Sequence, residues 1–498
     1  MTLPGNLYCG DSTYSLRGYD ITITPDFTSR TLSLDASIDI DNPNHIGSFD
    51  FGLSDRYTSV IVEADSSPTT IERAEGWITV HVTHPASSLR LKFHLEGTPG
   101  RSTDENRAVI ADSSLFLLWS DRFYPIDFEK WAPVRISVLL PPGFQAIAPG
   151  RLVSSIRRAA NTLCVFETSR PTAAFSVFAD SRWHDEERVV NGVKFRTLLF
   201  PQSERFRDQI FTSSGDVLRF YSAELSPYPF DEFGFVEIDS IYARRAFPGF
   251  IGYSPRYLEK EFTTTGYDAH ETALLWWDYT TRGSGPGNFQ WTEGFGDYSE
   301  VMYANAVGKP ISRTLQQFRE DYLNTPSSAD LLYNELRGDT PQKMIHGKYP
   351  WLMHLVRCVT GEKEFRAGLH RLFERYRYST FTMDEFISTL EKGTGHSLEW
   401  WRKDWLERRG VPDISASGAF RKTGSGNQLA YTLNQRGNIF HMPVNMAITS
   451  DGRTRVERVL LSKSVETFLF SSINPPAKIR LDPDGCILMR PVPPLDVK

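Results

Sequence analysis

The stretch His270-Glu-Thr-Ala-Leu-Leu-Trp-Trp277 decides how the rest of this sequence is interpreted. Residues four apart on a helix lie on one face, so a helix of the form His-Glu-x-x-His directs two imidazoles at a single metal ion. His270 occupies the first histidine position, and Leu274 occupies the second. The stretch therefore keeps the form of a metal-binding helix but lacks one of its two imidazoles.

The sequence after this helix fits the same pattern. Eighteen residues separate Leu274 from Glu293, and Trp276 follows two positions after the lost histidine. Glu293 opens the run Glu-Gly-Phe-Gly-Asp-Tyr-Ser-Glu, which ends at Glu300. These features resemble the gluzincin pattern HExxH-x18-E, in which the glutamate is the third zinc ligand. The chain is similar to the aminopeptidase N family of zinc metallopeptidases, most strongly over 233–412.

The resemblance implies a multidomain α+β fold. We expect an N-terminal β-sandwich-like domain over 1–190, a thermolysin-like α/β and helical domain over 191–412, and a C-terminal β-sandwich over 413–498. Residue patterns point the same way, because apolar and polar residues alternate in the manner of strands in both outer parts and helical spacing dominates after 265. Predicted strands include 19–24, 32–40, 77–82, 89–95, 135–140, 193–200, 233–238, 429–433 and 456–461; predicted helices include 205–224, 362–373 and one that opens with a capping box at Thr382 and Glu385.

Several positions depart from the family, and each affects chemistry. Ala246 stands where the family has the glutamate that holds a substrate's free amine, and Arg244 and Arg245 precede it. The segment 346–357 matches the family at Lys348, Trp351, His354 and Arg357. Its first residue, His346, replaces the tyrosine that would stabilise the tetrahedral intermediate. The ligand set, the amine anchor and the oxyanion stabiliser are therefore all altered.

The remaining ligands are too few for a catalytic zinc ion. Such a site normally has three protein ligands and a water molecule, and His270 and Glu293 supply two. Loss of an imidazole should weaken binding by more than the roughly 10–100-fold that changes around the ligands cost. We therefore expect no bound zinc, no other cofactor and no aminopeptidase activity. A residual zinc peptidase would need a further ligand such as Asp278.

Each candidate residue has a functional and a structural interpretation. His270, Glu271 and Glu293 could form a buried Glu–His–Glu bridge, or they could still move protons in surroundings that Leu274 makes drier. His346 could be a packed helical histidine, or a general acid or base near neutral pH.

The residues proposed to bind substrate carry the same ambiguity. Arg244 and Arg245 could be solvated charges at a strand edge, or they could turn the site toward a carboxylate, phosphate or sulfate group. Trp276 and Tyr349 could pack in the core and around the site, or could belong to an aromatic cage for a substrate. Tyr298 and Lys348 are the remaining candidates for contact with a substrate.

The leading functional hypothesis is a metal-independent acid–base enzyme derived from an aminopeptidase. Glu271, Glu293, His346 and His270 would be its catalytic residues, acting by elimination, cyclisation or ring opening on a small substrate with an anionic group in specialised metabolism. The alternative is a catalytically dead pseudo-peptidase that serves as a binding module or partner subunit. A residual zinc aminopeptidase is the third hypothesis.

Composition restricts the partners and the location of the chain. The net charge of −6 argues against a nucleic-acid partner, and no apolar run is long enough to span a membrane. The four cysteines, at positions 9, 164, 358 and 486, are far apart and include no Cys-x-x-Cys pair. We therefore expect no disulfide framework and, because no signal peptide is visible either, a cytoplasmic protein.

Overall fold

The chain folds into strands and helices that form two compact units. The structure is a computed structural model, and it describes residues 14–65, 67–98, 109–158, 160–241, 243–287, 290–326, 330–336, 340–424 and 426–498. The N-terminal unit contains the described residues up to Arg282 together with 376–380, and the C-terminal unit contains 283–375 and 381–498. The mixture of sheets and helices was expected, whereas the division into three domains stays a prediction.

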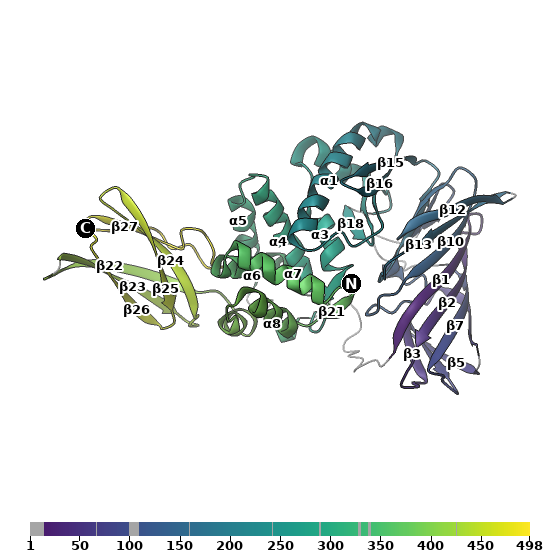
Figure 1. The fold of residues 1–498 in the computed structure, drawn as a ribbon, viewed down its shortest axis with the longest axis horizontal. Coiled ribbons are helices and arrows are strands. Elements are labelled where there is room, and N and C mark those ends of the chain that lie inside the picture. Colours follow the sequence, from purple (N-terminus) through teal and green to yellow (C-terminus); the bar gives the residue numbers. More distant parts are fainter. Residues whose placement is uncertain are drawn as a thin grey trace. The chain divides into compact units, whose positions relative to one another are not determined.

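The N-terminal unit begins with a seven-stranded sheet (Figure 1). Its strands form because apolar side chains recur at every second position, so that one face of the sheet is buried and the other meets water. Ile21, Ile23 and Leu34 are fully buried in this way. In spatial order the strands are β12 (Arg151–Arg158), β13 (Asn161–Glu167), β10 (Val134–Leu140), β1 (Ser15–Asp26), β2 (Thr31–Asp41), β7 (Ser88–Gly97) and β4 (Tyr57–Ala64).

Two smaller sheets complete this β region. The first runs β11 (Gln145–Ile147), β14 (Val177–Asp180), β9 (Ser114–Leu117) and β8 (Val109–Ala111). The second runs β3 (Ser48–Gly52), β6 (Trp77–Val82) and β5 (Thr69–Ala74). The strands predicted within 1–190 from alternation, including 77–82 and 89–95, are all present.

A five-stranded mixed sheet carries the residues of interest in the N-terminal unit. Its order is β15 (His184–Val190), β16 (Val193–Leu199), β17 (Glu232–Glu237), β19 (Phe250–Tyr253) and β18 (Arg244–Phe247). The parallel strands β16 and β17 are joined through the helix α1 (Arg207–Glu224), which follows the short helix η2 (Pro201–Phe206). A tight turn at Gly249, whose φ is +82°, returns β18 antiparallel to β19. This topology leaves β18 at the edge of the sheet.

Short helices follow that edge strand. They are α2 (Pro255–Lys260), the π-helical turn η3 (Glu261–Thr265) and α3 (His270–Trp277). The strand β20 (Thr281–Gly283) then pairs with β21 (Ser379–Phe381), and η1 (Trp119–Asp121) is a single turn earlier in the chain.

The C-terminal unit contains a second group of helices. They are α4 (Gln290–Ala306), α5 (Ser312–Leu323), α6 (Gln342–Thr360), α7 (Glu362–Arg375), α8 (Met383–Thr394) and α9 (Glu399–Trp401), with η5 (Tyr333–Glu335) and the π-helical turn η6 (Arg402–Leu406). Gly294 lets α4 approach α6 closely, since a Cβ there would lie 2.5 Å from the Cβ of Tyr349. The predicted capping box is confirmed, because the Glu385 amide donates to the Thr382 hydroxyl at 3.2 Å and the Glu385 carboxylate accepts from the Thr382 amide.

Two sheets end the chain. One runs β22 (Asp413–Thr423), β23 (Gly426–Arg436) and β26 (Val465–Ser471), and the other runs β25 (Arg453–Leu461), β24 (Met442–Ser450), β27 (Ala477–Leu481) and β28 (Leu495–Val497). A disulfide joins Cys358 of α6 to Cys486, which follows β27. The expectation that the cysteines form no disulfide was therefore wrong. Residues 128 positions apart in sequence meet only through the fold, and sequence spacing cannot reveal such a pair.

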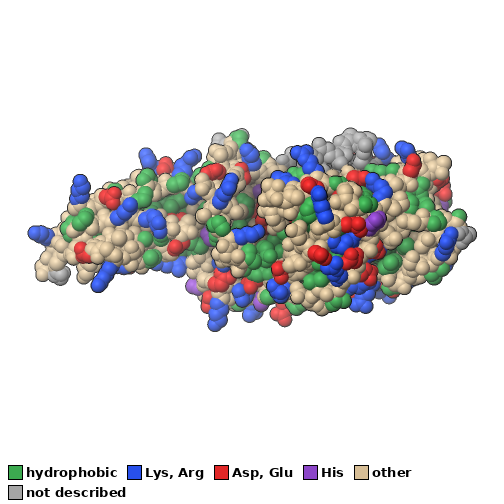
Figure 2. Space-filling model, turned by 90° about the horizontal axis from the view of Figure 1, so that it is seen from above, with side chains coloured by type: hydrophobic (Ala, Val, Ile, Leu, Met, Phe, Trp, Pro, Cys, Tyr) green, Lys and Arg blue, Asp and Glu red, His purple; other side chains and the backbone are tan. Residues whose placement is uncertain are grey.

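The surface carries both signs of charge. On the face seen in Figure 2, acidic and basic side chains are interspersed, in keeping with 61 acidic and 55 basic residues. Within the described residues, no helix combines the length and apolar character that crossing a bilayer requires. A cytoplasmic location stays a prediction, and the disulfide counts against it, because such bonds persist mainly in oxidising compartments.

Candidate functional site

The helix α3 is buried along its whole length in the N-terminal unit. Asp268 fixes its start, because the Asp268 carboxylate accepts from the amide of His270 at 2.9 Å. His270 and Glu271 are both 8% exposed, and Leu274 is 5% exposed. One turn after His270, the same helix face thus presents a buried hydrocarbon side chain in place of a second imidazole.

Arg244 of the edge strand β18 lies beside the acidic residues at the N-terminal end of α3. The Arg244 guanidinium forms an ion pair with Asp268, and its Nε lies 3.7 Å from Oε1 of Glu271. The three side chains are between 11% and 24% exposed, so water screens their charges little. We refer to Arg244, Asp268 and Glu271 as the arginine–carboxylate network. Arg244 is therefore not a solvated charge, and its guanidinium already has anionic partners from the protein itself.

The second carboxylate oxygen of Glu271 forms a hydrogen bond with the backbone of the edge strand β18. At Ala246, the amide donates to Oε2 of Glu271 at 2.7 Å, and the carbonyl accepts from the Tyr279 hydroxyl at 2.9 Å. An edge strand normally leaves such groups open to another extended chain. At this position both groups already have partners within the unit. A peptide could not pair with β18 at Ala246 without displacing a buried carboxylate and a buried hydroxyl.

These contacts do not suit a divalent cation. The helix α3 supplies one imidazole, and its adjacent carboxylate faces a guanidinium that repels positive charge. Among the described residues of the N-terminal unit, no three histidine, cysteine, aspartate or glutamate side chains bring their ligand atoms together. Asp278, the possible replacement ligand, is buried at the C-terminal end of α3. The residues present therefore do not fit the catalytic zinc ion that the family resemblance implies.

A further buried carboxylate, Glu261, lies beside this network. Its Oε1 accepts from the Tyr253 hydroxyl at 2.8 Å and from the Asp268 amide at 2.7 Å. Burial, together with the nearby charge of Asp268, raises the pKa of Glu261 from about 4.5 to about 7. A proton can therefore be held or released here near neutral pH.

The pKa of Glu261 predicts how stability depends on pH. The folded protein binds the Glu261 proton more tightly than the unfolded chain, so this residue's contribution to stability falls as pH rises from about 4.5 to about 7. The full difference is on the order of 3 kcal/mol. In Glu261→Gln the amide oxygen keeps both accepted hydrogen bonds, and this part of the pH dependence should vanish. Thermal unfolding of both proteins between pH 5 and pH 8 measures it; parallel curves would contradict the assignment.

The C-terminal unit holds a second set of candidates on α4 and α6. His346 donates or accepts at both ring nitrogens: Nδ1 lies 2.6 Å from Oδ2 of Asp297 and Nε2 lies 2.8 Å from Oε1 of Gln342. The imidazole is 35% exposed and Asp297 is 13% exposed. Glu293 lies in the first turn of α4, four residues before Asp297 and hence on the same helix face. An imidazole oriented by a carboxylate is suited to proton transfer when a substrate displaces the exposed Gln342 side chain from Nε2.

A buried cluster lies further along α6. The Tyr298 hydroxyl is 3.1 Å from Nδ1 of His354 and accepts from Arg357 at 3.4 Å. Burial raises the pKa of Tyr298 to about 12, and burial next to Arg357 lowers the pKa of His354 to about 4. Both side chains are therefore uncharged at neutral pH.

Several predicted substrate-binding residues have partners inside the protein. The Trp276 indole donates to the Ser226 carbonyl at 2.8 Å and is fully buried. Lys348 is 1% exposed, its Nζ lies 3.9 Å from Asp330, and burial lowers its pKa to about 8. Tyr298 and Tyr349 are also almost completely buried. The burial of Trp276 and Tyr349 favours their packing interpretation. Arg245 is half-buried, and its guanidinium lies 5.4 Å from the Trp119 ring centroid.

Sequence reasoning missed three residues of these sets. Asp268 and Glu261 lie just before the His270 helix, and Asp297 lies within the run that identifies Glu293. An aspartate two residues before a predicted helix is a capping signal, so Asp268 could have been found. Asp297 is placed by its contact with His346, 49 positions later in the chain. Glu261 is placed by hydrogen bonds to Tyr253 and Asp268, eight and seven positions away, which residue spacing alone does not display.

Comparisons with known proteins support an aminopeptidase-like relationship over part of the chain. The chain is 22% identical over 167 residues to "Probable aminopeptidase 2" of Sulfurisphaera tokodaii, covering 33% of this chain and 20% of the relative. It is 23% identical over 160 residues to "Aminopeptidase N" of Lactococcus lactis subsp. lactis, covering 30% and 19% respectively. For "Leucyl aminopeptidase" of Saccharolobus solfataricus, the identity is 19% over 166 residues, covering 33% and 20%. The matches thus span about a fifth of the length of these relatives, and no protein-family model matches the chain.

Proposed function

We propose that this aminopeptidase-like protein is an acid–base enzyme that works without zinc. The observation that carries the proposal is the Asp297–His346 pair, a carboxylate and an imidazole joined at 2.6 Å on a side chain that is 35% exposed. His346 exchanges the proton with the substrate, and Asp297 orients the ring and stabilises its charged form. Glu293, on the same face of α4 as Asp297, is the second proton-transferring group.

The N-terminal unit has a different part in this proposal. Glu271 is the proposed base of this unit, with His270 as its buried neighbour, and Arg244 keeps Glu271 in the carboxylate form that can accept a proton. Arg245 is the guanidinium left to attract an anionic group of a small substrate, because Arg244 is held by Asp268 and Glu271. Elimination, cyclisation and ring opening in specialised metabolism suit these groups, since none of them requires a metal-bound hydroxide.

Two variants test the enzyme. His346→Gln and Glu271→Gln should each lower product formation by roughly 10²–10⁴-fold, which is the usual contribution of a positioned acid or base. Untargeted comparison of metabolites from cells that express each variant or the native chain measures this loss even while the substrate is unidentified. His396→Gln, at an exposed histidine between α8 and α9, is the matched control and should behave like the native chain.

A second candidate function is a pseudo-peptidase that binds a partner. It is favoured by two observations. The amide and carbonyl of Ala246 are hydrogen-bonded within the unit and so not open to a peptide substrate, and apolar side chains are exposed on two edge strands of the C-terminal sheets. Those side chains are Val456 and Leu460 on β25, and Val465 and Leu469 on β26, each more than half exposed. Unchanged metabolites in correctly folded His346→Gln and Glu271→Gln would contradict the enzyme and support this candidate.

A further inference from the structure

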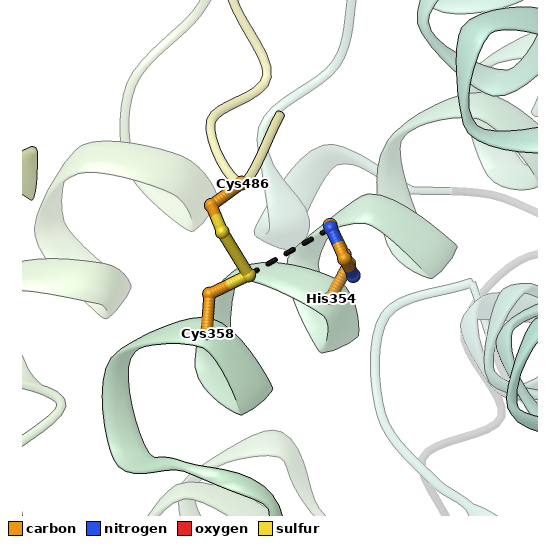
Figure 3. Close-up of side chains that lie close together, drawn as sticks. All are labelled: His354, Cys358 and Cys486. Carbon is orange, nitrogen blue, oxygen red and sulfur yellow. Dashed lines mark hydrogen bonds between the residues drawn. A yellow bond between two sulfur atoms is a disulfide. The ribbon is translucent and has the colours of Figure 1, made fainter. Parts of the chain in front are cut away.

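One cluster of metal-ligating side chains lies in the C-terminal unit, apart from the residues proposed to act on a substrate. His354 and Cys358 are four residues apart on α6 and therefore share one helix face. Cys486 approaches them from the segment after β27, and the three side chains point toward one another (Figure 3). Their ligand atoms all lie within 4.8 Å of each other.

The spacing of the two ligands on α6 matches that of a zinc site. Nε2 of His354 lies 3.7 Å from Sγ of Cys358. A tetrahedral zinc ion, with a Zn–S bond of about 2.3 Å and a Zn–N bond of about 2.0–2.1 Å, separates its nitrogen and sulfur ligands by about 3.6 Å. The helix therefore already holds two ligands at the required spacing.

The protein also fixes the third ligand and the imidazole by contacts that do not involve sulfur. The Cys486 amide donates to Asp482 at 2.9 Å, and the Cys486 carbonyl accepts from the Trp351 indole at 3.1 Å. The Tyr298 hydroxyl contacts Nδ1 of His354, which keeps Nε2 directed at Cys358. Hydrogen bonds of this kind orient the ligands of metal sites.

We propose that Cys358, Cys486 and His354 bind Zn²⁺ when the Cys358–Cys486 disulfide is reduced. A dithiol reductant transfers two electrons and two protons to the disulfide, giving two thiols, and itself becomes a disulfide. Zinc then displaces both thiol protons and binds the two thiolates and the imidazole, with water as the fourth ligand. The two half-buried cysteines are accessible enough for this exchange. The cluster thus alternates between a disulfide and a metal site.

Cobalt binding by the full chain tests this proposal, because thiolate ligands give Co²⁺ a charge-transfer absorption that carboxylates and imidazole do not. The reduced protein should bind one Co²⁺ with this absorption, zinc should displace it, and the oxidised protein should show neither. Cys358→Ser and Cys486→Ser should each weaken zinc binding at least on the order of 100-fold. Cys164→Ser changes a buried cysteine that has no disulfide partner, and it should bind as the native chain does.

Three results would overturn the proposal. They are a disulfide that is reduced only after the protein unfolds, a reduced folded protein without the thiolate absorption, and absorption that persists in folded Cys358→Ser. His270→Ala should leave the cobalt signal unchanged, which separates this cluster from the helix α3. The proposed acid–base function stands or fails independently of these outcomes.

Discussion

Replacing Arg244 with alanine is expected to destabilise the N-terminal unit by about 2–4 kcal/mol, somewhat less than the loss of a partner from a fully buried ion pair. The substitution leaves Asp268 and Glu271 with little exposure and without the guanidinium between them. In a unit of this size the change corresponds to a fall of roughly 5–10 °C in the unfolding temperature. Differential scanning calorimetry of the full chain measures it.

The neighbouring arginine provides the matched control. Arg245→Ala removes a cation–π contact with Trp119 and should cost about 1 kcal/mol or less. Adding Glu271→Gln to Arg244→Ala should restore part of the lost stability, because the second change removes one of the two negative charges that Arg244 faced. If Arg244→Ala is no more harmful than Arg245→Ala, the arginine–carboxylate network does not stabilise the unit.

Leu274→His is expected to raise zinc affinity at least on the order of 100-fold, since it returns an imidazole ligand one turn from His270 on the same face of α3. Peptidase activity should not return with the metal. The guanidinium of Arg244 still lies beside Glu271, and the amide of Ala246 still donates its hydrogen bond to Glu271. Isothermal titration of oxidised, thiol-blocked protein with zinc measures the affinity, and hydrolysis of aminoacyl anilides measures the activity.

Removal of His270 is the control for the expected gain in zinc affinity. Adding His270→Ala to Leu274→His should abolish the new zinc binding, because the pair of imidazoles is broken. A gain that survives without His270 would place the metal elsewhere. Peptidase activity in Leu274→His would show that the missing imidazole at position 274 is the only feature that prevents peptide hydrolysis.

Much of the local structure could be predicted from the sequence, because it follows from short-range periodicity. The alternation in 32–40 and the capping residues Thr382 and Glu385 act over a few positions, and the structure confirms both the strand and the helix start. The partner of Arg244 could not be predicted in the same way. Whether a strand arginine meets water or a buried carboxylate depends on which side of the sheet faces the helix α3.

In the candidate site, too, the sequence predicted local spacing but not contacts between residues far apart in the chain. Sequence comparison with a metal-binding helix identified His270, Glu271 and the lost ligand at Leu274, since their spacing is local. It gave no indication that Glu271 would accept a hydrogen bond from the amide of Ala246, because that contact joins an edge strand to a helix 25 positions later. The disulfide of Cys358 is a similar case, with its partner 128 positions away.

Zinc content of the native chain tests the central claim most directly. The claim is that the helix α3 no longer holds a catalytic metal, because Leu274 supplies no ligand and Arg244 faces Glu271. Elemental analysis of oxidised, thiol-blocked protein should find fewer than about 0.1 zinc ions per chain after dialysis against micromolar zinc. A ratio near one that disappears in His270→Ala would contradict the account.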